Sequence, residues 1–359
     1  MTARIRAVRT LMERLRLDGI LLSGRPATAW LSGFSGSTSQ LLVTRQAAWL
    51  VVDFRYVLAA QRQATAGIEV VTFQDSYPEA LERLLSRHGI RHLGFEGDAL
   101  TVSEYERFRD RLRTPSRYLA LSVELSELRA RKDAEELHAI RTAAGIADAV
   151  YAEILPLIRP GMVESILAAE IEYRMRRHGA QGAAFPTIVA SGPNAALPHA
   201  EASDRAFMTG DAILMDFGAK HDGYCSDMTR TVFLGEPPEV LRTIYGIVLG
   251  AQRAALAAIR PGMTGCAADA IARRIITDAG YGNCFGHSLG HGVGLEIHEE
   301  PRLSVPSKDV LEAGMVFTVE PGIYIEGVGG VRIEDMGVLA ADGFASFTRT
   351  PTELLVLPV

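Results

Sequence analysis

A five-residue sequence, IRPGM, occurs twice in this chain, at residues 158–162 and 259–263. Each copy ends one helical stretch and opens another, and a glycine-rich, strand-like region that contains histidines follows each. A second pair of segments, 209–218 and 312–322, is also similar. The copies of IRPGM are offset by 101 residues, and the acidic residues of the second pair by 104. This repeated order predicts a duplicated α-α-β-β unit with pseudo-twofold symmetry, in which a site between the halves receives equivalent residues from each.

The repeat leaves the N-terminal third of the chain for a different domain. Residues 1–125 alternate short apolar runs with amphipathic stretches, which predicts a small α/β domain. We expect strands at 19–24, 47–53, 68–73 and 91–97 and helices at 54–64, 78–89 and 103–112. Residues 126–158 have helical periodicity with few breakers, so we place the boundary near residue 125. One long helix would open the second domain, 126–359; two helices broken at Gly145 are the alternative.

Composition excludes several classes of protein. The formal net charge of −6 argues against a nucleic-acid binder. The chain has no uncharged apolar run of about 18 residues, and its N-terminus lacks the apolar core of a signal peptide, so no membrane partner is expected. Three cysteines without a CxxC pair argue against a disulfide framework or a thiolate zinc site, which favours a reduced, cytoplasmic protein. Any metal must therefore be bound by histidines and carboxylates.

Two pairs of acidic residues flank predicted turns in the repeated halves. Asp216 and Asp227 lie on either side of an Asp-Gly dipeptide, and Glu320 and Glu334 are symmetric about a glycine-rich turn. We expect each pair to stand nearly opposite on adjacent antiparallel strands, with Cβ atoms about 4.5–5.5 Å apart. A solvated acidic face is the alternative, but the flanking residues are apolar. Four carboxylates in an apolar interior are costly without a cation, so we predict a metal site that can hold two divalent ions.

Histidines gather at matching places of the repeat. His287, His291 and His298 lie within residues 286–301, and His199 precedes His298 by 99 residues. The HSLGH segment shares only its spacing with the HExxH zinc motif, since it lacks the glutamate that follows the first histidine. We therefore expect these histidines to join the carboxylates rather than to form a helical zinc site.

The second domain resembles the pita-bread metallopeptidases, which include prolidase, aminopeptidase P and methionine aminopeptidase. The resemblance rests on the ordered set Asp216, Asp227, His291, Glu320 and Glu334 and on the motifs PHA, MDFG, SDMTRT, GHGVGLEIHEEP, VEPGIY and VRIED. The first domain resembles the creatinase-type N-terminal domain, including WLSGFSGS at 30–37. The resemblance implies an α+β chain: a small α/β creatinase-like domain, then a pita-bread fold of two pseudo-twofold-related α-α-β-β halves.

The resemblance also implies the roles of the metal ligands. Asp216 would chelate one metal ion, and Asp227 and Glu334 would bridge both ions. His291 and Glu320 would complete the shell of the second ion. Glu320 would also carry a proton to the leaving nitrogen.

Further roles follow from the same resemblance. His199 and His298 would contact substrate and stabilise the tetrahedral intermediate, and His287 would line the site. Arg332 would support the metal cluster, and Arg302 would bind the free carboxylate of a dipeptide. For an apolar proline pocket Phe185 and Tyr324 are candidates, with core packing as the alternative for each.

The implied function is a dinuclear exopeptidase that hydrolyses the Xaa-Pro bond with a hydroxide that bridges two metal ions. The short first domain and Arg302 favour an Xaa-Pro dipeptidase that acts on dipeptides. An aminopeptidase P that acts on longer peptides is the alternative, and a non-catalytic peptide-binding pseudoenzyme is the alternative of another class. Mn²⁺ suits the oxygen-rich ligands, and Co²⁺ or Zn²⁺ would also fit. A homodimer is expected from the family.

Overall fold

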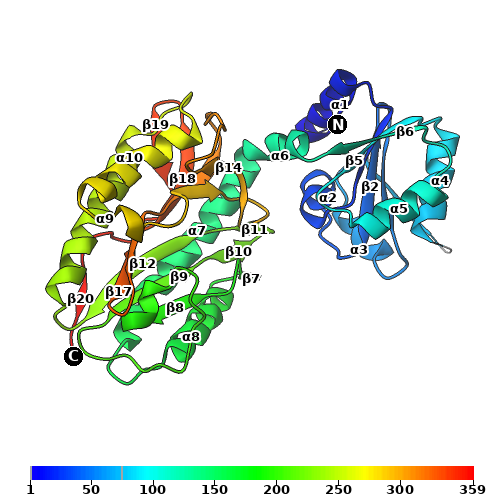
Figure 1. The fold of residues 1–359 in the computed structure, drawn as a ribbon. Helices are drawn as coiled ribbons and strands as arrows, with labels where there is room; N and C mark the ends of the chain where they lie inside the picture. Colours follow the sequence, from blue (N-terminus) through cyan, green and yellow to red (C-terminus); the bar gives the residue numbers. More distant parts are fainter. Residues whose placement is uncertain (1, 74–75) are drawn as a thin grey trace. The chain divides into compact units, whose positions relative to one another are not determined.

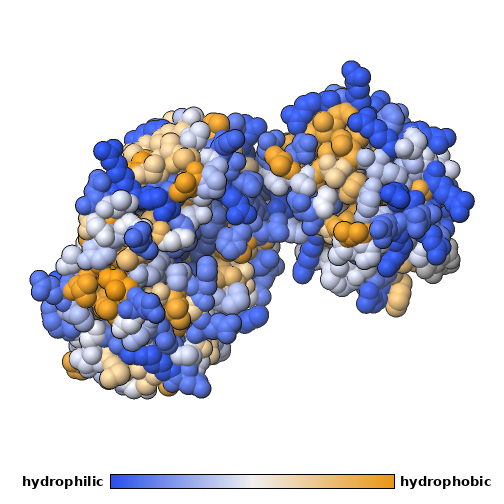
Figure 2. Space-filling model, viewed as in Figure 1, coloured by the Kyte–Doolittle hydropathy of each residue, from blue (hydrophilic) through white to orange (hydrophobic). Residues whose placement is uncertain are grey.

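The computed structural model describes residues 2–73 and 76–359. The chain divides into two compact units, the first ending at Leu128 and the second beginning at Arg129 (Figure 1). Within the described ranges, no helix is long and apolar enough to cross a membrane. The visible face of each unit is largely hydrophilic, with separate hydrophobic patches (Figure 2).

The first unit is built on a mixed six-stranded sheet in the order β4-β3-β2-β1-β5-β6. Its strands are β1 (Gly19–Leu22), β2 (Ser39–Thr44), β3 (Ala48–Val52), β4 (Glu69–Thr72), β5 (His92–Glu96) and β6 (Arg117–Leu121). Its helices are α1 (Ala3–Leu15), α2 (Arg25–Ser32), α3 (Val57–Gln63), α4 (Tyr77–Arg87) and α5 (Val102–Arg111). Leu81 and Leu85 of α4 pack with Trp49 and Val51 of β3 in one buried apolar cluster.

Among the described residues of this unit, the sequence prediction found β1, β3, β4 and β5 and helices α3, α4 and α5. It missed α1, α2, β2 and β6. The charges scattered along α1 conceal a helical stripe of buried residues, Ile5, Val8 and Met12, at the spacing of one helix face.

The helical stretch that joins the units differs from both sequence alternatives. It is neither one helix nor broken at Gly145: α6 (Val123–Ala130) ends, and α7 (Ala134–Ile154) begins after a short gap. Asp133 ends the gap because its side chain accepts hydrogen bonds from the Glu135 and Glu136 N–H groups at 3.1 and 3.0 Å. The Glu136 side chain in turn accepts from the Asp133 N–H at 2.8 Å, which completes a capping box. The capping box therefore starts a new helix although the helical periodicity of the sequence continues across the gap.

The second unit contains the two repeated halves. The first half comprises α7, α8 (Glu164–Arg177), β7 (Gly182–Ala183), β8 (Ile188–Ser191), β9 (Ala212–Phe217), β10 (Ala219–His221), β11 (Tyr224–Cys225) and β12 (Met228–Leu234). The second comprises α9 (Glu239–Ala258), α10 (Gly265–Asp278), β13 (Gly290–Gly292), β14 (Glu299–Leu303), β15 (Val316–Val319), β16 (Gly322–Ile325), β17 (Gly329–Arg332), β18 (Asp335–Ala340) and β19 (Gly343–Ser346). Short 3-10 helices η1 (Leu155–Leu157), η2 (Gly192–Ala196) and η3 (Gly282–Cys284) and strand β20 (Val356–Leu357) complete it.

The IRPGM copies form the same backbone turn in both halves. Gly161 and Gly262 both have left-handed φ angles, 82° and 91°, which favour glycine. Their N–H groups donate to the carbonyls of Phe207 and Leu311 at 2.9 and 2.8 Å. The predicted duplication is therefore confirmed at the level of individual hydrogen bonds.

Each half packs its own helix pair against its own sheet. The first sheet has the order β20-β12-β9-β8, and a buried cluster joins it to α7 and α8. The second has the order β14-β13-β15-β18-β19, and another cluster joins it to α9 and α10. The strands thus lie between the two helix pairs (Figure 1).

Candidate metal centre

The first acidic pair comes from the hairpin of β9 and β12. Its turn residues Asp222 and Gly223 both have positive φ, 47° and 83°, as the Asp-Gly dipeptide predicts for a tight hairpin. The pairing is symmetric about this turn, so Asp216 stands opposite Thr229 rather than opposite Asp227. The expected register is therefore wrong by two residues. Since side chains two residues apart share a face of a strand, Asp227 still projects to the same side as Thr229.

The second acidic pair comes from the longer hairpin that contains β15 to β18. β15 and β18 stay in register up to Val319 and Asp335. β16 and β17 continue in the same register towards the turn. Glu320 and Glu334 therefore stand opposite each other, as their symmetric placement about the turn predicts.

Both hairpins and a histidine converge on one point. Asp227, His291 and Glu334 each offer a ligand atom, and these atoms all lie within 4.8 Å of one another. His291 Nε2 lies 3.5 Å from Asp227 Oδ2 and 3.3 Å from Glu320 Oε1. His291 Nδ1 lies 3.1 Å from the Gly292 carbonyl, which can only accept, so Nδ1 carries the hydrogen and Nε2 faces the carboxylates.

The electrostatics of this cluster favour a cation. Burial raises the pKa of Asp216, and burial together with the Glu334 and Asp216 charges holds the pKa of Asp227 well above its usual range. Burial and the Glu320 and Asp216 charges do the same to the pKa of Glu334. Asp216 Oδ1 and Glu334 Oε1 are buried and have no hydrogen-bond partner among the described residues. These unsatisfied acceptors, with the imidazole beside them, fit divalent metal ions.

Glu320 differs from the other three carboxylates. Burial opposes its ionisation, but the hydrogen bond and charge of His291 prevail and lower the pKa of Glu320 to about 2. Thr318 Oγ1 donates to Glu320 Oε1 at 3.0 Å and accepts from the His291 N–H at 3.1 Å. This threonine therefore fixes a carboxylate and a histidine together, with Glu320 ionised.

Arg332 links the two hairpins. It is only 3% exposed, and its Nη2 donates to Asp216 Oδ2 at 2.6 Å. Its Nε donates to Thr229 Oγ1 at 3.0 Å, and that hydroxyl donates to Glu334 Oε2 at 2.7 Å. One arginine and one threonine thus contact a carboxylate from each hairpin.

Replacing Thr229 by valine should weaken metal binding by about 10–100-fold, the usual cost of losing a residue that orients a metal ligand. Valine keeps the shape but removes the hydroxyl between Arg332 and Glu334. Calorimetric titration of the metal-free protein measures the affinity. Thr28→Val in the first unit is the control, because the Thr28 hydroxyl is also buried yet touches no site residue. An unchanged affinity in Thr229→Val would contradict the assigned role.

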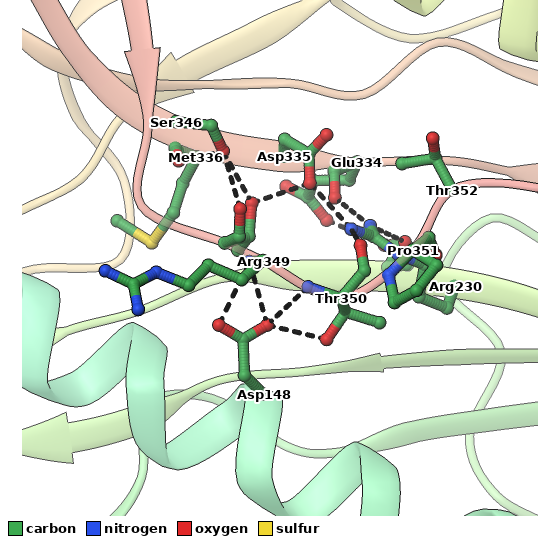
Figure 3. Close-up of polar contacts among 12 residues, drawn as sticks. Asp148, Arg230, Glu334, Asp335, Met336, Ser346, Arg349, Thr350, Pro351 and Thr352 are labelled. Atoms are coloured by element: carbon green, nitrogen blue, oxygen red, sulfur yellow. Dashed lines mark hydrogen bonds and ion pairs between the residues drawn. The ribbon is translucent and has the colours of Figure 1, made fainter.

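Arg230 on β12 binds the backbone of Glu334 and of the C-terminal segment (Figure 3). It is 1% exposed, and its guanidinium donates to five oxygens around it: the carbonyls of Thr229 (2.9 Å), Glu334, Thr350 (2.7 Å) and Pro351 (3.0 Å) and the carboxylate of Asp335 (2.7 Å). The Thr350 hydroxyl donates to Asp148 of α7 at 2.6 Å. The backbone of Glu334 is therefore tied through the C-terminal segment to the first helix of this unit.

The carboxylates open into a cavity of about 510 Å³. Its wall contains the residues that the sequence singled out, with the exception of Tyr324: Phe185, His199, Asp216, Asp227, His287, His291, His298, Arg302, Glu320, Arg332 and Glu334. The rings of His291 and His298 lie 4.3 Å apart. Burial lowers the pKa of His287 and of His298, which favours their neutral forms.

Tyr324 takes a different place from the one expected for a substrate contact. It is absent from the cavity wall, and its hydroxyl lies between Arg332 Nη1 (2.8 Å) and His287 Nε2 (2.9 Å). It therefore braces two site residues. The apolar part of the wall comes instead from Phe185 and Pro186 and from residues that the sequence did not single out: Ile188, Pro198, Ala200, Ala202 and Ile297.

Sequence reasoning also missed the threonines that hold the ligands. Thr229 and Thr318 each lie two residues from a carboxylate just beyond the end of the same strand, a spacing that places the two side chains on one face where the chain stays extended. That alternation was the available signal. Their hydrogen bonds could not be read without the packing of the two hairpins.

Two known protein families match successive parts of the chain. Residues 138–341 match metallopeptidase family M24, and residues 4–131 match the creatinase/prolidase N-terminal domain. An Xaa-Pro dipeptidase from Bacillus anthracis has a similar solved structure, with a TM-score of 0.95, 43% identity and 99% of each chain covered. An X-Pro aminopeptidase from Thermotoga maritima gives a TM-score of 0.90 at 38% identity, covering 96% of this chain and 99% of that one.

A further relative is similar in sequence over nearly its whole length. The Xaa-Pro dipeptidase of Pyrococcus horikoshii is 37% identical over 356 residues, which is 99% of each chain. These matches confirm the expected fold class, a creatinase-like α/β domain followed by a pita-bread domain of two related halves.

Proposed function

Because the chain belongs to metallopeptidase family M24 and carries a creatinase/prolidase N-terminal domain, we propose that it is an Xaa-Pro dipeptidase. The observation that carries the proposal is the convergence of Asp227, His291 and Glu334 in one cavity that also presents Arg302. The similar dipeptidases cover nearly the whole chain, which supports the same substrate class.

The residues of the cavity divide the work of hydrolysis. Divalent ions, when bound, polarise the scissile carbonyl and lower the pKa of water so that hydroxide is available at neutral pH. We assign Asp216, Asp227, His291, Glu320 and Glu334 to hold two such ions, Mn²⁺ in the first place because the ligands are rich in oxygen. His298, whose neutral form burial favours, and His199 would donate hydrogen bonds to the developing oxyanion. Ionised Glu320 would accept a proton and pass it to the leaving imide nitrogen.

Arg302 is the residue that favours a dipeptidase over an aminopeptidase. Its side chain lines the cavity and is 65% exposed, and its Nε lies 3.8 Å from Glu300 Oε1, beyond hydrogen-bond distance. The guanidinium therefore keeps donors available for the free carboxylate of a dipeptide. In a longer peptide the residue that follows the scissile bond carries a peptide group in place of the free carboxylate.

Arg302→Ala should raise the KM for Ala-Pro about 10–100-fold, the cost of losing a hydrogen bond to a charged group, while changing the KM for Ala-Pro-Ala little. Steady-state kinetics with both peptides measure the difference. Arg274→Ala is the matched control, since this arginine on α10 is 83% exposed and outside the cavity wall. Equal losses on both peptides would remove the carboxylate role of Arg302.

The function itself is tested with three peptides in the presence of Mn²⁺. We expect the protein to cleave Ala-Pro, to cleave Ala-Pro-Ala far more slowly, and to leave Ala-Ala intact. Comparable rates on Ala-Pro and Ala-Pro-Ala would favour an aminopeptidase P. Cleavage of none of these peptides would favour the non-catalytic peptide-binding alternative, against which the convergence of the predicted ligands argues.

We also propose a cytoplasmic homodimer. The thiols of Cys225, Cys266 and Cys284 are free, which fits a reducing compartment. The dimer rests on the family resemblance, and light scattering coupled to gel filtration tests it.

A further inference from the structure

The longest continuous stretch of the cavity wall is a segment without helix or strand. Residues 198–202 all line the cavity, and His199 is among them. The segment lies in the connection between η2 and β9. No ladder holds it, and within it the Pro198 carbonyl accepts from Arg332 Nη1 at 3.1 Å, so the position of His199 depends on that bond and on what fixes the two ends of this loop.

A single buried carboxylate binds both ends, and at the second end the Ser165 N–H also donates to the Ser203 carbonyl at 3.0 Å. Glu164, the first residue of α8, is 0% exposed. Before the segment, its Oε1 accepts from the N–H and the hydroxyl of Ser191, both at 2.7 Å. After the segment, its Oε2 accepts from the N–H and the hydroxyl of Ser203, at 3.1 and 2.6 Å. The Asn194 amide donates to both oxygens at 3.2 Å.

The second half of the repeat holds another histidine by the same means. Asp269 of α10 is 1% exposed and accepts from the Leu289 N–H at 3.1 Å. It also binds the guanidinium of Arg273, at 2.6 and 2.9 Å. Arg273 donates to the carbonyls of Phe285 and His287 at 2.9 and 2.7 Å. The loop that carries His287 to the cavity is thus held on both sides of that residue.

We propose that Glu164 and Asp269 are positioning residues, each of which anchors from the second helix of its half the loop that presents one cavity histidine. The proposal rests on the proposed function for its kinetic consequences. The two carboxylates do not occupy equivalent positions, because Glu164 is the first residue of α8 and Asp269 the fifth of α10. The two halves therefore share the anchoring of the loop without sharing the residue.

Only a carboxylate can serve as the anchor for His199. An ionised carboxyl group accepts about four hydrogen bonds through its two oxygens. Glutamine presents an NH₂ group in place of one oxygen, and that group would face the N–H and hydroxyl donors of Ser191 or Ser203. One end of the loop would then be released while the helix and the volume of the side chain stay the same.

The first test is hydrogen–deuterium exchange, which needs no activity. Glu164→Gln should raise exchange in residues 192–202 and leave 283–289 unchanged. Asp269→Asn, the matched variant, should do the reverse. Unchanged exchange in both segments, or a rise spread over the whole second unit in either variant, would overturn the proposal.

The second test is a crossed set of double-mutant cycles on kcat/KM for Ala-Pro. A misplacement of about 1 Å costs on the order of 100-fold, so Glu164→Gln should lower kcat/KM by up to that factor. In the His199→Ala background the same change should have an effect within about twofold, because the two act through one group. In the His287→Ala background, Glu164→Gln should lower kcat/KM by the same factor as in the wild type. Equal effects in both backgrounds would show that Glu164 only stabilises the fold.

The outcomes separate this proposal from the proposed function. If the wild type does not cleave Ala-Pro, the function fails, and the exchange experiment still decides the anchoring. If Glu164→Gln does not fold, Ser203→Ala removes the hydroxyl that donates to Glu164 and that accepts from the Asn194 amide and the Arg205 N–H. Ser203→Ala should also raise exchange in residues 192–202 and lower kcat/KM only when His199 is present, with smaller changes than Glu164→Gln. If neither change occurred, the proposal would be contradicted.

Discussion

Asp227→Asn should abolish hydrolysis of Ala-Pro and yet leave the metal-free protein at least as stable as the wild type. Metal ions contribute several kcal/mol to the transition state, so losing a carboxylate assigned to both ions should lower kcat by about 1,000-fold or more. In the metal-free protein the same carboxylate is buried beside Glu334 and Asp216 and is repelled by both. Asparagine removes that repulsion without changing the shape of the side chain.

The pH dependence of this effect has a definite sign. The pKa of Asp227 is raised in the folded protein, so its favourable contribution is present below the ordinary carboxyl pKa and is lost as the pH rises through the raised value. The stability advantage of the Asp227→Asn variant in the metal-free protein should therefore grow from acidic to neutral pH. Thermal unfolding of both chelated proteins at several pH values measures it. Asp222→Asn, at the exposed turn, should change neither stability nor rate.

A lower Tm for chelated Asp227→Asn at neutral pH would contradict the account of the cluster as mutually repelling carboxylates. Retention of the wild-type rate would contradict the assignment of Asp227 as a ligand. The two readouts therefore test the electrostatics and the chemistry separately.

Arg230→Met should destabilise the protein by about 3–5 kcal/mol, because it leaves the Asp335 carboxylate buried without its charged partner. The change also removes the donors to the backbone of Glu334 and Thr229, so metal affinity should fall with stability. Denaturant unfolding of the metal-free protein and calorimetric titration measure the two effects.

Arg253→Met provides the matched control. Arg253 pairs with Glu353, but the two side chains are 53% and 69% exposed, so the loss should stay below about 1 kcal/mol. If Arg230→Met destabilised the protein no more than Arg253→Met, the network in Figure 3 would not hold the second unit together.

The architecture of the second unit could be predicted from the sequence because the duplicated halves contain the same local sequence patterns. The IRPGM turns, the Asp-Gly hairpin turn and the symmetric placement of Glu320 and Glu334 are local patterns with fixed geometric consequences. They were sufficient to place the two hairpins and to predict that their acidic residues meet. The register error at Asp216 arose because the midpoint of the two aspartates is not the centre of the turn.

Asp133 was missed as a helix start because the periodicity continues across it, although the Asp133–Glu136 spacing of its capping box is a local signal. Other features depend on contacts between distant segments and left no local signal. Tyr324 resembles a substrate contact in sequence, but its hydroxyl lies between Arg332 and His287, which only the folded hairpin brings together. Glu164 reads as an ordinary residue of an amphipathic helix until the loop from Ser191 to Ser203 is seen to close over it.

The most direct test of the central claim follows metal binding and hydrolysis in one titration. The protein is freed of metal with a chelator, Mn²⁺ is added stepwise, and bound ions per chain and the rate on Ala-Pro are measured together. We predict that the metal-free protein is inactive, that two ions bind, and that the rate appears as they bind. Hydrolysis that persists without metal, or a protein that takes up no Mn²⁺, would contradict a metal centre built from these carboxylates and His291.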